Sequence, residues 1–400
     1  MRVLVVHNRY RSAQPSGENV VVDEEAELLA ASGCTVERLE VSSDEIATWS
    51  PARRALLPAR VVWSLEGGRL AREAIESFEP DVVHVHNTFP LLSPAVLRAA
   101  HASPAAVVQT LHNFRPLCAD ASFLRNGRVC ESCLGRSPLP GVIHGCYRES
   151  VLKTLPVAAM IATHRGLGTW RRCVDLFVLP SEFARGKYVE AGWDAERLVV
   201  KPNTARDPGT VAETREGGLV CVARLTAEKG VDVLVEAWRR ADAPRLTIVG
   251  DGDAADALRA AGRGISFPGR LSREEVGVVV ATARAVVIPS RCYEVFPRTL
   301  VEAYAAGVPV VASRIGSLAE LVEHEHTGLL VEPDDPDDLA HALRRIESEP
   351  GLAERLGSAA REAYESRYSP ARTTGRLLDI YGRAVALKAA SAVRPLEAAS

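Results

Sequence analysis

The sequence predicts an α/β protein made of two Rossmann-like domains, and three observations support this fold class. Short apolar runs alternate with longer amphipathic runs, as in parallel βαβ units. The alternation stops over residues 204–218, a polar stretch rich in proline and glycine, and then restarts. A chain of 400 residues is also too long for one ordinary core. We therefore expect two similar domains that face each other across a cleft, which is the default ligand site.

The first half contains short apolar runs that we interpret as buried parallel strands. These runs are 3–7, 35–41, 81–86, 105–111, 174–179 and 198–201. Between them, residues 19–31 place Val22, Ala26 and Leu29 on one side of a helix, and residues 64–78 form a second helix. We predict that residues 1–205 form the first domain, with a cysteine-rich insertion at 114–147.

The second half repeats the same alternation. The predicted strands are 219–223, 246–250, 265–267, 285–289 and 308–312, and the main helices are 231–240 and 298–306. We predict a second domain over 206–370 and a C-terminal helix over 371–400 that returns to the first domain. The chain from Pro336 onward is mostly helical, and residues 391–400 are expected to fray.

Composition and charge exclude several classes of protein. The chain has 48 basic and 51 acidic residues, whereas a dedicated nucleic-acid binder usually has a strong basic excess. No apolar run reaches the length needed to span a bilayer, and the first residues do not resemble a signal peptide. We therefore expect a cytoplasmic protein, in which the 8 cysteines are thiols or metal ligands rather than disulfides.

Two cations in the second half could bind a phosphorylated ligand. Arg224 and Lys229 lie in a turn between a predicted strand and helix, so both can approach one anion. The alternative is that both are solvated surface residues. The turn at 249–252 has two glycines, which would allow a ligand to approach the backbone closely, although any tight turn can have this pattern.

Residues 290–302 are the most informative stretch. Glu294 lies in a strand-to-helix turn, and Pro297 is a favourable first helical residue. Apart from Pro297, the backbone N–H groups of residues 296–300 could hold phosphate at the helix start. Glu302 follows on the same helix and could meet ribose hydroxyls. Two glutamates at this spacing also occur by chance, but their position at a helix start favours a functional role.

These motifs together resemble the retaining glycosyltransferases of family 4, which have the GT-B fold. The matching segments are A-R-L-x3-K-G at 223–230, V-G-D-G at 249–252, Y-E-V-F-P at 293–297 with V-E-A at 301–303, P-D-V-V-H-V-H at 80–86 and Q-T-L-H-N at 109–113. The resemblance covers nearly the whole chain. Each segment is weakly specific alone, but the combination in this order is specific.

The resemblance implies roles for individual residues. Arg224 and Lys229 would neutralise the nucleotide diphosphate, Glu294 would contact the donor sugar, and His112 would face that sugar. The implied donor-binding residues are Gly17, Gly250, Phe296, Pro297, Thr299, Leu300 and Glu302. The chain departs from the family pattern at 16–18, where Ser-Gly-Glu replaces the commoner double glycine, and at Val295, where glycine is commoner.

The resemblance also implies transfer of a hexose from a UDP- or GDP-sugar to a hydroxyl of a glycan, lipid-linked or small acceptor. Transfer would proceed with retention and without a catalytic metal, and it would serve polysaccharide biosynthesis. Fixed cations and a helix N-terminus can stabilise the leaving diphosphate. The carboxylates Asp251 and Asp253 have the spacing of a metal-binding pair but fall in the glycine turn.

Four histidines of the first domain lie in predicted strands or at their ends. His112 ends a predicted strand and could equally be a hydrogen-bonded structural residue. We expect His86 and Asn87 to line the acceptor side of the cleft, and we rank His7 and His84 lower.

Four cysteines lie in the insertion, at Cys118, Cys130, Cys133 and Cys146. Their spacing includes a C-x2-C pair and matches a tetrahedral structural zinc site. An iron–sulfur cluster and plain thiols are the alternatives. Such a site would stabilise the fold of the insertion and would take no part in a catalytic reaction.

Residues 150–172 mix apolar side chains with Lys153, Arg165, Arg171 and Arg172. They are either an amphipathic helix that touches the inner face of an anionic membrane or a helix packed on the first sheet.

Three other functions remain open. A nucleotide-sugar epimerase or hydrolase could share this fold, and a non-catalytic protein could bind the same donor. A nicotinamide-dependent oxidoreductase fits less well, because no G-x-G-x-x-G motif follows the first strand of either half.

Overall fold

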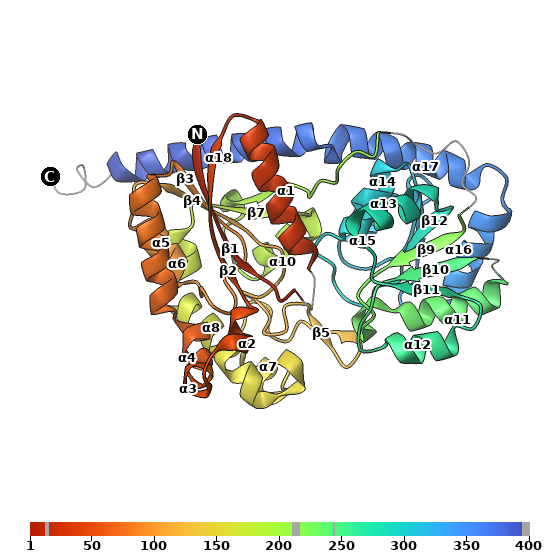
Figure 1. The fold of residues 1–400 in the computed structure, drawn as a ribbon, viewed down its shortest axis with the longest axis horizontal. Helices are drawn as coiled ribbons and strands as arrows, with labels where there is room; N and C mark the ends of the chain where they lie inside the picture. Colours follow the sequence, from red (N-terminus) through yellow and green to blue (C-terminus); the bar gives the residue numbers. More distant parts are fainter. Residues whose placement is uncertain (13–15, 210–216, 243–244, 394–400) are drawn as a thin grey trace. The chain divides into compact units, whose positions relative to one another are not determined.

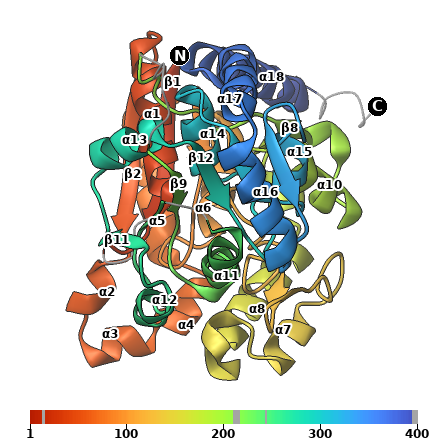
Figure 2. The same cartoon turned by 90° about the vertical axis from the view of Figure 1, so that its right-hand side faces the viewer.

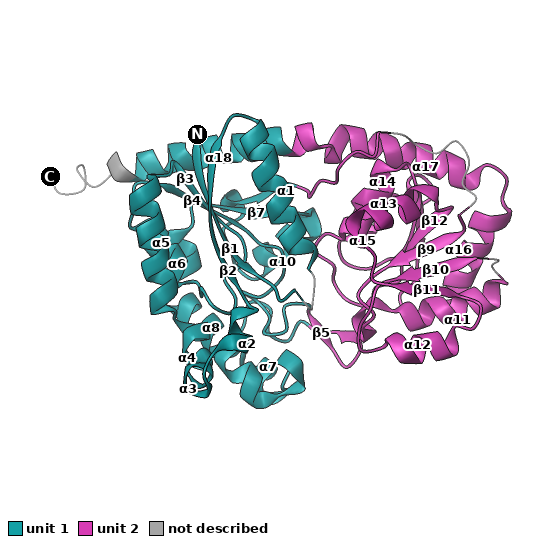
Figure 3. Cartoon of the chain, in the orientation of Figure 1, with its two compact units in different colours: residues 1–122, 131–201, 374–400 teal, residues 123–130, 202–373 magenta. Residues whose placement is uncertain are grey.

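The computed structural model describes residues 1–12, 16–209, 217–242 and 245–393. Its contacts divide the chain into two compact units (Figure 3). Unit 1 consists of residues 1–122, 131–201 and 374–400, and unit 2 of residues 123–130 and 202–373. Each unit contains a six-stranded parallel sheet, so the predicted pair of α/β domains is confirmed. Residues 210–216 of the predicted linker and residues 394–400 of the predicted frayed end lie outside the described residues.

The sheet of unit 1 has the strand order β2-β1-β3-β4-β7-β8. Its strands are β1 (Arg2–Arg9), β2 (Thr35–Ser42), β3 (Val82–Val85), β4 (Ala106–Thr110), β7 (Leu176–Leu179) and β8 (Leu198–Val200). Strand β1 pairs in parallel with β2 on one side and with β3 on the other. The strand order therefore reverses between β1 and β3, and α/β sheets usually bind ligands at the carboxyl ends of strands at such a switch point.

Helices cover both faces of this sheet (Figure 1). They are α1 (Gly17–Ala31), α2 (Glu45–Thr48), α3 (Pro51–Ala55), α4 (Leu57–Val62), α5 (Leu65–Phe78), α6 (Ala95–His101), α7 (Leu139–Ile143), α8 (Val151–Gly166), α9 (Thr169–Cys173) and α10 (Glu182–Glu190), with short 3₁₀ turns at Tyr147–Glu149 and Ala195–Arg197. Val22 and Leu29 of α1 pack with Val3 and Val5 of β1 in one buried cluster.

The sheet of unit 2 has the strand order β11-β10-β9-β12-β13-β14. Its strands are β9 (Leu219–Val222), β10 (Leu246–Val249), β11 (Ser266–Gly269), β12 (Ala285–Ile288), β13 (Val310–Ser313) and β14 (Gly328–Val331). Strand β9 pairs with β10 on one side and with β12 on the other, so the switch point lies between β9 and β12. The carboxyl ends of these two strands lead directly into the predicted site residues.

The helices of unit 2 pack on two faces of the sheet. Figures 1 and 2 show α11 and α12 on one side, with α13 and α14 on the other. The helices are α11 (Val231–Ala241), α12 (Ala255–Ala261), α13 (Arg273–Thr282), α14 (Arg298–Ala305), α15 (Leu318–Leu321), α16 (Pro336–Ser348) and α17 (Leu352–Ala363), with a 3₁₀ turn at Ala227–Lys229 and a π turn at Tyr364–Tyr368. Two buried clusters fill the two faces, one around Leu234 and the other around Leu300.

A single cut at the linker would not separate the two units, because two segments belong to the unit on the other side of it. Helix α18 (Pro370–Val393) begins in unit 2 and belongs to unit 1 from Thr374 onward, where Leu377, Ile380 and Tyr381 join the unit 1 core (Figure 3). Residues 123–130, which the sequence analysis placed in the first domain, are grouped with unit 2. They form the hairpin β5 (Leu124–Arg125) and β6 (Arg128–Val129), preceded by Phe123, whose ring meets that of Tyr293 edge-to-face.

Candidate functional site

The switch point of unit 2 brings together a lysine and a glutamate that are far apart in the sequence. Lys229 follows β9 and Glu294 follows β12, and their Nζ and Oε1 atoms are 2.5 Å apart. The hydroxyl of Ser290 donates a hydrogen bond to the same carboxylate oxygen at 2.8 Å. The predicted cation and the predicted sugar-binding carboxylate are therefore an ion pair in this structure.

Both members of this pair stay ionised. Burial alone would raise the pKa of Glu294, but Lys229 and the Ser290 hydroxyl outweigh it, so that pKa is lowered. Burial alone would lower the pKa of Lys229, but the charge of Glu294 outweighs it, so that pKa is raised. The pair therefore holds a fixed ammonium charge at the carboxyl edge of the sheet.

Arg224 remains open to solvent beside this pair. Its side chain is 57% exposed, and its guanidinium is 3.4 Å from the carboxylate of Glu228. The charge of Arg224 acts on both Lys229 and Glu294, which places all three groups in one electrostatic neighbourhood. An exposed guanidinium next to a fixed ammonium can meet an incoming anion.

At the start of helix α14, backbone N–H groups rather than the predicted side chains are available to bind phosphate. The side chains of Phe296 and Leu300 are buried in the unit 2 core. The N–H of Leu300 donates to the carbonyl of Pro297 at 3.2 Å, and the Thr299 hydroxyl contacts the carbonyl of Val222 at 3.4 Å. The predicted phosphate site therefore depends on the remaining N–H groups at the start of this helix, not on that of Leu300.

Glu302 lies one turn into α14 and is paired within the helix. Arg298 donates to its carboxylate at 2.7 Å, and the Glu302 side chain is 25% exposed. The two residues are four apart, so this pairing follows directly from helical geometry. A ribose hydroxyl would have to share this carboxylate with Arg298.

Gly250 is required by the fold at the end of β10. Its φ is +133°, and a Cβ there would lie 1.9 Å from the carbonyl oxygen of Ala223. No larger side chain fits without moving the turn that carries Arg224. Gly250 thus fixes the shape of the site, whether or not it touches a ligand.

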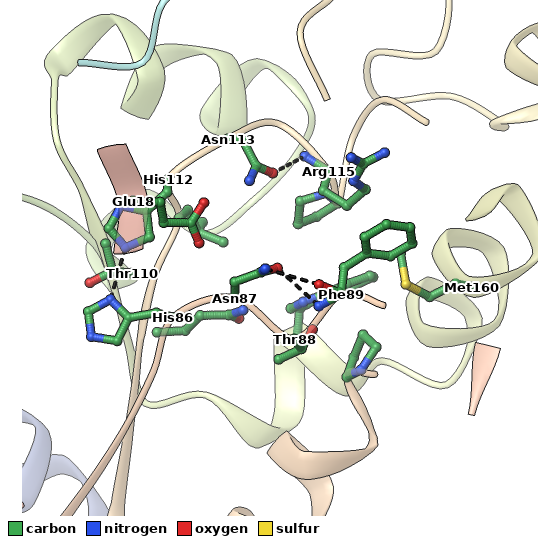
Figure 4. A pocket seen from close by; sticks show the side chains of 15 residues that line it. Glu18, His86, Asn87, Thr88, Phe89, Thr110, His112, Asn113, Arg115 and Met160 are labelled. Carbon is green, nitrogen blue, oxygen red and sulfur yellow. Dashed lines mark hydrogen bonds between the residues drawn. The ribbon is translucent and has the colours of Figure 1, made fainter. Parts of the chain in front are cut away.

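Unit 1 has a pocket at the carboxyl end of its sheet (Figure 4). It is lined by Glu18, His86, Asn87, Thr88, Phe89, Pro94, Gln109, Thr110, Leu111, His112, Asn113, Arg115, Pro116, Met160 and Trp170. The predicted residues His86, Asn87 and His112 are all among them. Carboxyl, amide and imidazole groups beside an apolar wall can hold a polyhydroxylated ligand.

The side-chain amide of Asn87 forms hydrogen bonds with backbone groups of β1 and of the loop after β3. Its nitrogen donates to the carbonyls of Asn8 at 2.7 Å and Phe89 at 3.0 Å, and its oxygen accepts from the Phe89 N–H at 3.0 Å. Asn87 therefore braces the loop after β3 that forms one wall of the pocket.

Glu18 is a pocket residue that sequence reasoning missed. It follows Gly17, which opens α1, and its carboxylate accepts a hydrogen bond from the hydroxyl of Tyr10 at 3.1 Å. Burial raises the pKa of Glu18 to about 7, against the opposing effect of Tyr10, Arg115 and a hydrogen bond from Asn113. Its signal in the sequence was the departure from the double glycine at 16–18.

His112 and His86 form a hydrogen-bonded pair. His86 Nδ1 and His112 Nε2 are 2.9 Å apart, and the two rings stack with their centroids 5.2 Å apart. His86 is buried and His112 is half-buried, and both line the pocket. Burial lowers the pKa of both rings well below the usual value, so both are neutral at physiological pH.

Glu25, His84 and His86 are the group of described residues whose potential metal-ligand atoms lie within 4.8 Å of one another. However, the ring nitrogens of His84 already face the hydroxyls of Thr110 and Tyr381, each at 2.7 Å. Glu25 forms a buried ion pair with Lys201. The group is thus occupied by its own hydrogen bonds and by an ammonium, and we assign no metal to it.

The cysteines of the insertion do not appear in that group. Cys118 and Cys133 are buried, and Cys130 and Cys146 are half-buried. Cys130 follows the β5–β6 hairpin as the last residue of the segment grouped with unit 2, whereas the other three belong to unit 1.

Residues 150–172 form α8 and most of α9, which pack within unit 1. Val157, Met160 and Ile161 of α8 are buried, whereas Leu152 is 83% exposed and Leu155 is 54% exposed. Among the described residues, no helix is both long and apolar enough to cross a membrane.

Comparison with known proteins follows the same division of the chain. Residues 15–205 match a family model described as Glycosyltransferase Family 4, and residues 207–363 match one described as Glycosyl transferases group 1. A GDP-mannose-dependent alpha-(1-6)-phosphatidylinositol monomannoside mannosyltransferase of Mycobacterium tuberculosis is 31% identical over 257 residues. This match covers 57% of the chain and 65% of the mycobacterial protein, which is less than two thirds of its length.

A glycogen synthase of the same organism is 35% identical over 190 residues, 45% of this chain and 44% of that protein. Among solved structures, sucrose-phosphate synthase from Thermosynechococcus elongatus has a TM-score of 0.70 at 18% identity and covers 96% of this chain and 99% of its own. Anabaena HepE in complex with UDP has a TM-score of 0.64 at 19% identity, with 96% and 100% covered. The structures share the fold, and the two family models account for both domains. The chain therefore belongs to the family 4 glycosyltransferases and has the GT-B fold.

Proposed function

We propose that this protein is a retaining glycosyltransferase that moves a hexose from a nucleoside diphosphate sugar to a hydroxyl group. The observation that carries the proposal is the ion pair of Lys229 with Glu294 at the switch point of unit 2, beside the exposed Arg224. Such an arrangement is suited to a dianionic leaving group, because the ammonium is held in place before the ligand arrives.

The proposed mechanism depends on the charges that develop on the diphosphate and on the sugar during the reaction. As the bond between sugar and phosphate breaks, negative charge grows on the diphosphate and positive character grows on the sugar. Lys229, Arg224 and the start of α14 would stabilise the diphosphate without requiring a divalent ion. Glu294 would orient Lys229 and, through its carboxylate, contact the donor sugar. Retention of configuration is part of the proposal and rests on the family.

The donor is proposed to be a UDP- or GDP-sugar. The mycobacterial relative is named as GDP-mannose-dependent, and HepE is described in complex with UDP. The acceptor is proposed to be a glycan, lipid-linked or small molecule that carries a free hydroxyl, and the unit 1 pocket supplies polar groups for it. The same relative acts, by its name, on a phosphatidylinositol mannoside.

Donor turnover tests the proposal. The purified protein is incubated with a panel of UDP-, GDP-, ADP- and dTDP-sugars, with and without EDTA and a glycan and lipid extract. We expect release of nucleoside diphosphate from one donor that requires the extract and persists in EDTA. Release without extract would support an epimerase or hydrolase instead. Binding without release in any mixture would support a non-catalytic donor-binding protein.

We also propose a structural zinc ion on Cys118, Cys130, Cys133 and Cys146. This proposal rests on their spacing and on soft thiolate chemistry, which suits zinc. Elemental analysis of protein purified without added metal is expected to find about one zinc per chain. Finding iron would support a cluster, and finding neither metal would support plain thiols.

Peripheral membrane contact is proposed at α7 and the start of α8. Leu139 and Ile143 of α7, and Val151, Leu152 and Leu155 of α8, are all more than half exposed. The neighbouring Arg148, Glu149 and Lys153 are also exposed, so exposed apolar side chains stand beside two basic residues and one acidic residue. This combination fits an anionic lipid surface.

Vesicle flotation tests this contact. We expect binding to phosphatidylglycerol vesicles, weaker binding to phosphatidylcholine vesicles, and loss of binding in the double variant Leu152→Ser, Leu155→Ser. Val278→Ser in unit 2, where Val278 is 66% exposed, is the matched control. Equal binding of wild type and double variant would contradict the assignment.

A further inference from the structure

The carboxyl end of the unit 1 sheet is lined by neutral histidines. His7 lies on β1, His84 on β3, His86 just after β3 and His112 just after β4. Burial lowers the pKa of each of these rings, and that of His84 falls to about 3. Each ring therefore carries one N–H and one bare nitrogen, and the positions of these protons decide which hydrogen bonds form.

A single proton lies between His86 and His112. Because Nδ1 of His86 and Nε2 of His112 are 2.9 Å apart, one nitrogen must donate and the other must accept. If His86 donates, His112 keeps its own proton on Nδ1. If His112 donates, its Nδ1 is bare, and His86 carries its proton on Nε2.

Glu25 discriminates between these two arrangements. Nε2 of His86 lies 4.0 Å from Oε2 of Glu25, and this buried carboxylate oxygen has no hydrogen-bond partner among the residues that the structure describes. The other oxygen of Glu25 is bound by the ammonium of Lys201. A bare Nε2 would direct its lone pair at a negatively charged oxygen, whereas an N–H there directs a positive hydrogen at it.

None of the other described groups around His86 forms a hydrogen bond with its Nε2 that would offset the effect of Glu25. The ring of His84 is 4.1 Å away between centroids, but its nitrogens face Thr110 and Tyr381. The ring of His7 is 6.2 Å away and faces Asn19 through Nε2. None of the hydrogen bonds of Lys201 among the described residues reaches a histidine ring, since its ammonium binds Glu25.

We infer that Glu25 and His86 are positioning residues that hold the proton of His112 on Nε2, so that His112 presents a bare Nδ1 to the unit 1 pocket. The pocket would then recognise a hydroxyl group that donates a hydrogen bond to His112. It would disfavour an ether or fluorine at the same position, since these groups cannot donate. The identity of that hydroxyl as a sugar hydroxyl rests on the proposed function, but the position of the proton does not.

Nitrogen-15 NMR of the histidine-labelled full chain at neutral pH tests the inference directly. The resonances of His112 and His86 are assigned by their loss in His112→Phe and His86→Phe. We expect His112 to carry its proton on Nε2 and to show an unprotonated Nδ1. A proton on Nδ1 of His112 would overturn the inference, whatever the protein catalyses.

The variant Glu25→Gln is expected to reverse the arrangement. The amide oxygen of glutamine should face the ammonium of Lys201, which leaves the NH₂ group to donate to Nε2 of His86. His86 would then donate from Nδ1, and the proton of His112 would move to its own Nδ1. An unchanged His112 spectrum in folded Glu25→Gln would contradict the role of Glu25. The wild-type spectrum decides the proton position even if this variant does not fold.

A kinetic measurement separates this role from a purely structural one. The assay uses the donor that the panel identifies. Wild-type protein should turn over the substrate whose sugar carries the hydroxyl faster than the deoxyfluoro analogue of that substrate. Glu25→Gln should reduce this preference by about 3- to 10-fold, the scale of one neutral hydrogen bond. A merely structural effect would lower turnover of both sugars equally. Absence of any turnover would contradict the proposed function and leave the NMR result standing.

Discussion

Each unit has its candidate site at the carboxyl edge of a six-stranded parallel sheet, but the two sites have different electrostatic environments. Each sheet reverses its strand order at one point, between β1 and β3 in unit 1 and between β9 and β12 in unit 2. In unit 2 the loops at this point hold the ionised pair Lys229 and Glu294, next to the exposed Arg224. In unit 1 the loops after β3 and β4 hold the stacked neutral rings of His86 and His112, and the buried charges of Glu25 and Lys201 are paired with each other.

This difference suggests a division of labour that follows from burial and pairing. A partly exposed ion pair keeps its charge, so it can meet a phosphate with little reorganisation. Buried imidazoles lose their charge, so they distinguish hydrogen-bond donors from acceptors instead of attracting anions. We therefore expect charge-removing substitutions to act mainly in unit 2 and proton-shifting substitutions mainly in unit 1.

The largest effect is expected from removing the fixed ammonium of unit 2. Lys229→Ala should lower sugar transfer by about 100- to 1,000-fold, the scale of losing one preorganised electrostatic stabiliser. Glu294 would also be left without its counter-ion, so its pKa should rise. The measurement is the rate of nucleoside diphosphate release at saturating donor.

Arg259→Ala is the control for Lys229→Ala. Arg259 lies on α12 of the same unit, with its side chain 41% exposed, and it pairs only with the fully exposed Asp256 among the ion pairs of the described residues. This variant should retain wild-type activity. Activity of Lys229→Ala within twofold of wild type would contradict the role of the unit 2 pair.

Gly250→Ala should damage unit 2 by geometry rather than charge. The new Cβ would lie 1.9 Å from the carbonyl oxygen of Ala223, at a φ of +133°. Strain and overpacking of this kind cost about 2–4 kcal/mol together. Chemical denaturation should show this loss. Gly277→Ala on α13, where a Cβ meets no atom of the described residues within 4 Å, should not destabilise the protein.

The sequence predicted the parts of the fold that depend on local pattern. The core strands were found because buried parallel strands are continuous apolar runs, as in Val82–Val85 and Ala285–Ile288. The helices α2 to α4 were not predicted, because each is only one or two turns long and has too few residues to show a helical period.

The candidate site was predicted as a set of residues but not as a set of contacts. Lys229 and Glu294 were both named, yet their pairing joins positions 65 residues apart. Glu25 was not named, because an acidic residue on an amphipathic helix looks like part of a solvated face. Only the fold shows that Glu25 is buried against Lys201, 176 residues away.

A smaller effect, and one that depends on pH, is expected at Glu18 of unit 1. Its pKa is about 7 in the folded protein and about 4.5 as an unperturbed carboxyl. Between these values the folded protein binds more protons than the unfolded chain, so its free energy of unfolding falls as the pH rises from about 4.5 to about 7. Glu18→Gln should remove this slope, which amounts to about 1–3 kcal/mol over the window.

Denaturant unfolding of wild type and Glu18→Gln at several pH values measures the slope. Glu73→Gln on the exposed face of α5 is the control, since the Glu73 side chain is 55% exposed. Parallel pH profiles for wild type and Glu18→Gln would show that burial in the pocket does not perturb Glu18.

The smallest effect on sugar transfer is expected at Tyr381, whose hydroxyl links α18 to the histidines. Its hydroxyl lies 2.7 Å from Nδ1 of His84 in the buried core of unit 1. Tyr381→Phe removes the hydroxyl and leaves a buried ring nitrogen without that partner, at a cost of about 1–3 kcal/mol in the free energy of unfolding. Because the other nitrogen of His84 still faces Thr110, the proton of His84 can settle there, and His86 and His112 should keep their arrangement.

The NMR spectrum of Tyr381→Phe should therefore show the same protonated nitrogen on His112 as the wild type, with a lower melting temperature. Sugar transfer should change by less than about threefold, because neither the ion pair of unit 2 nor the bare Nδ1 of unit 1 is altered. A large loss of transfer, or movement of the His112 proton, would mean that the histidines act as one coupled chain from α18 to the pocket. The contrast between the two units would then have to include the C-terminal helix as part of the unit 1 site.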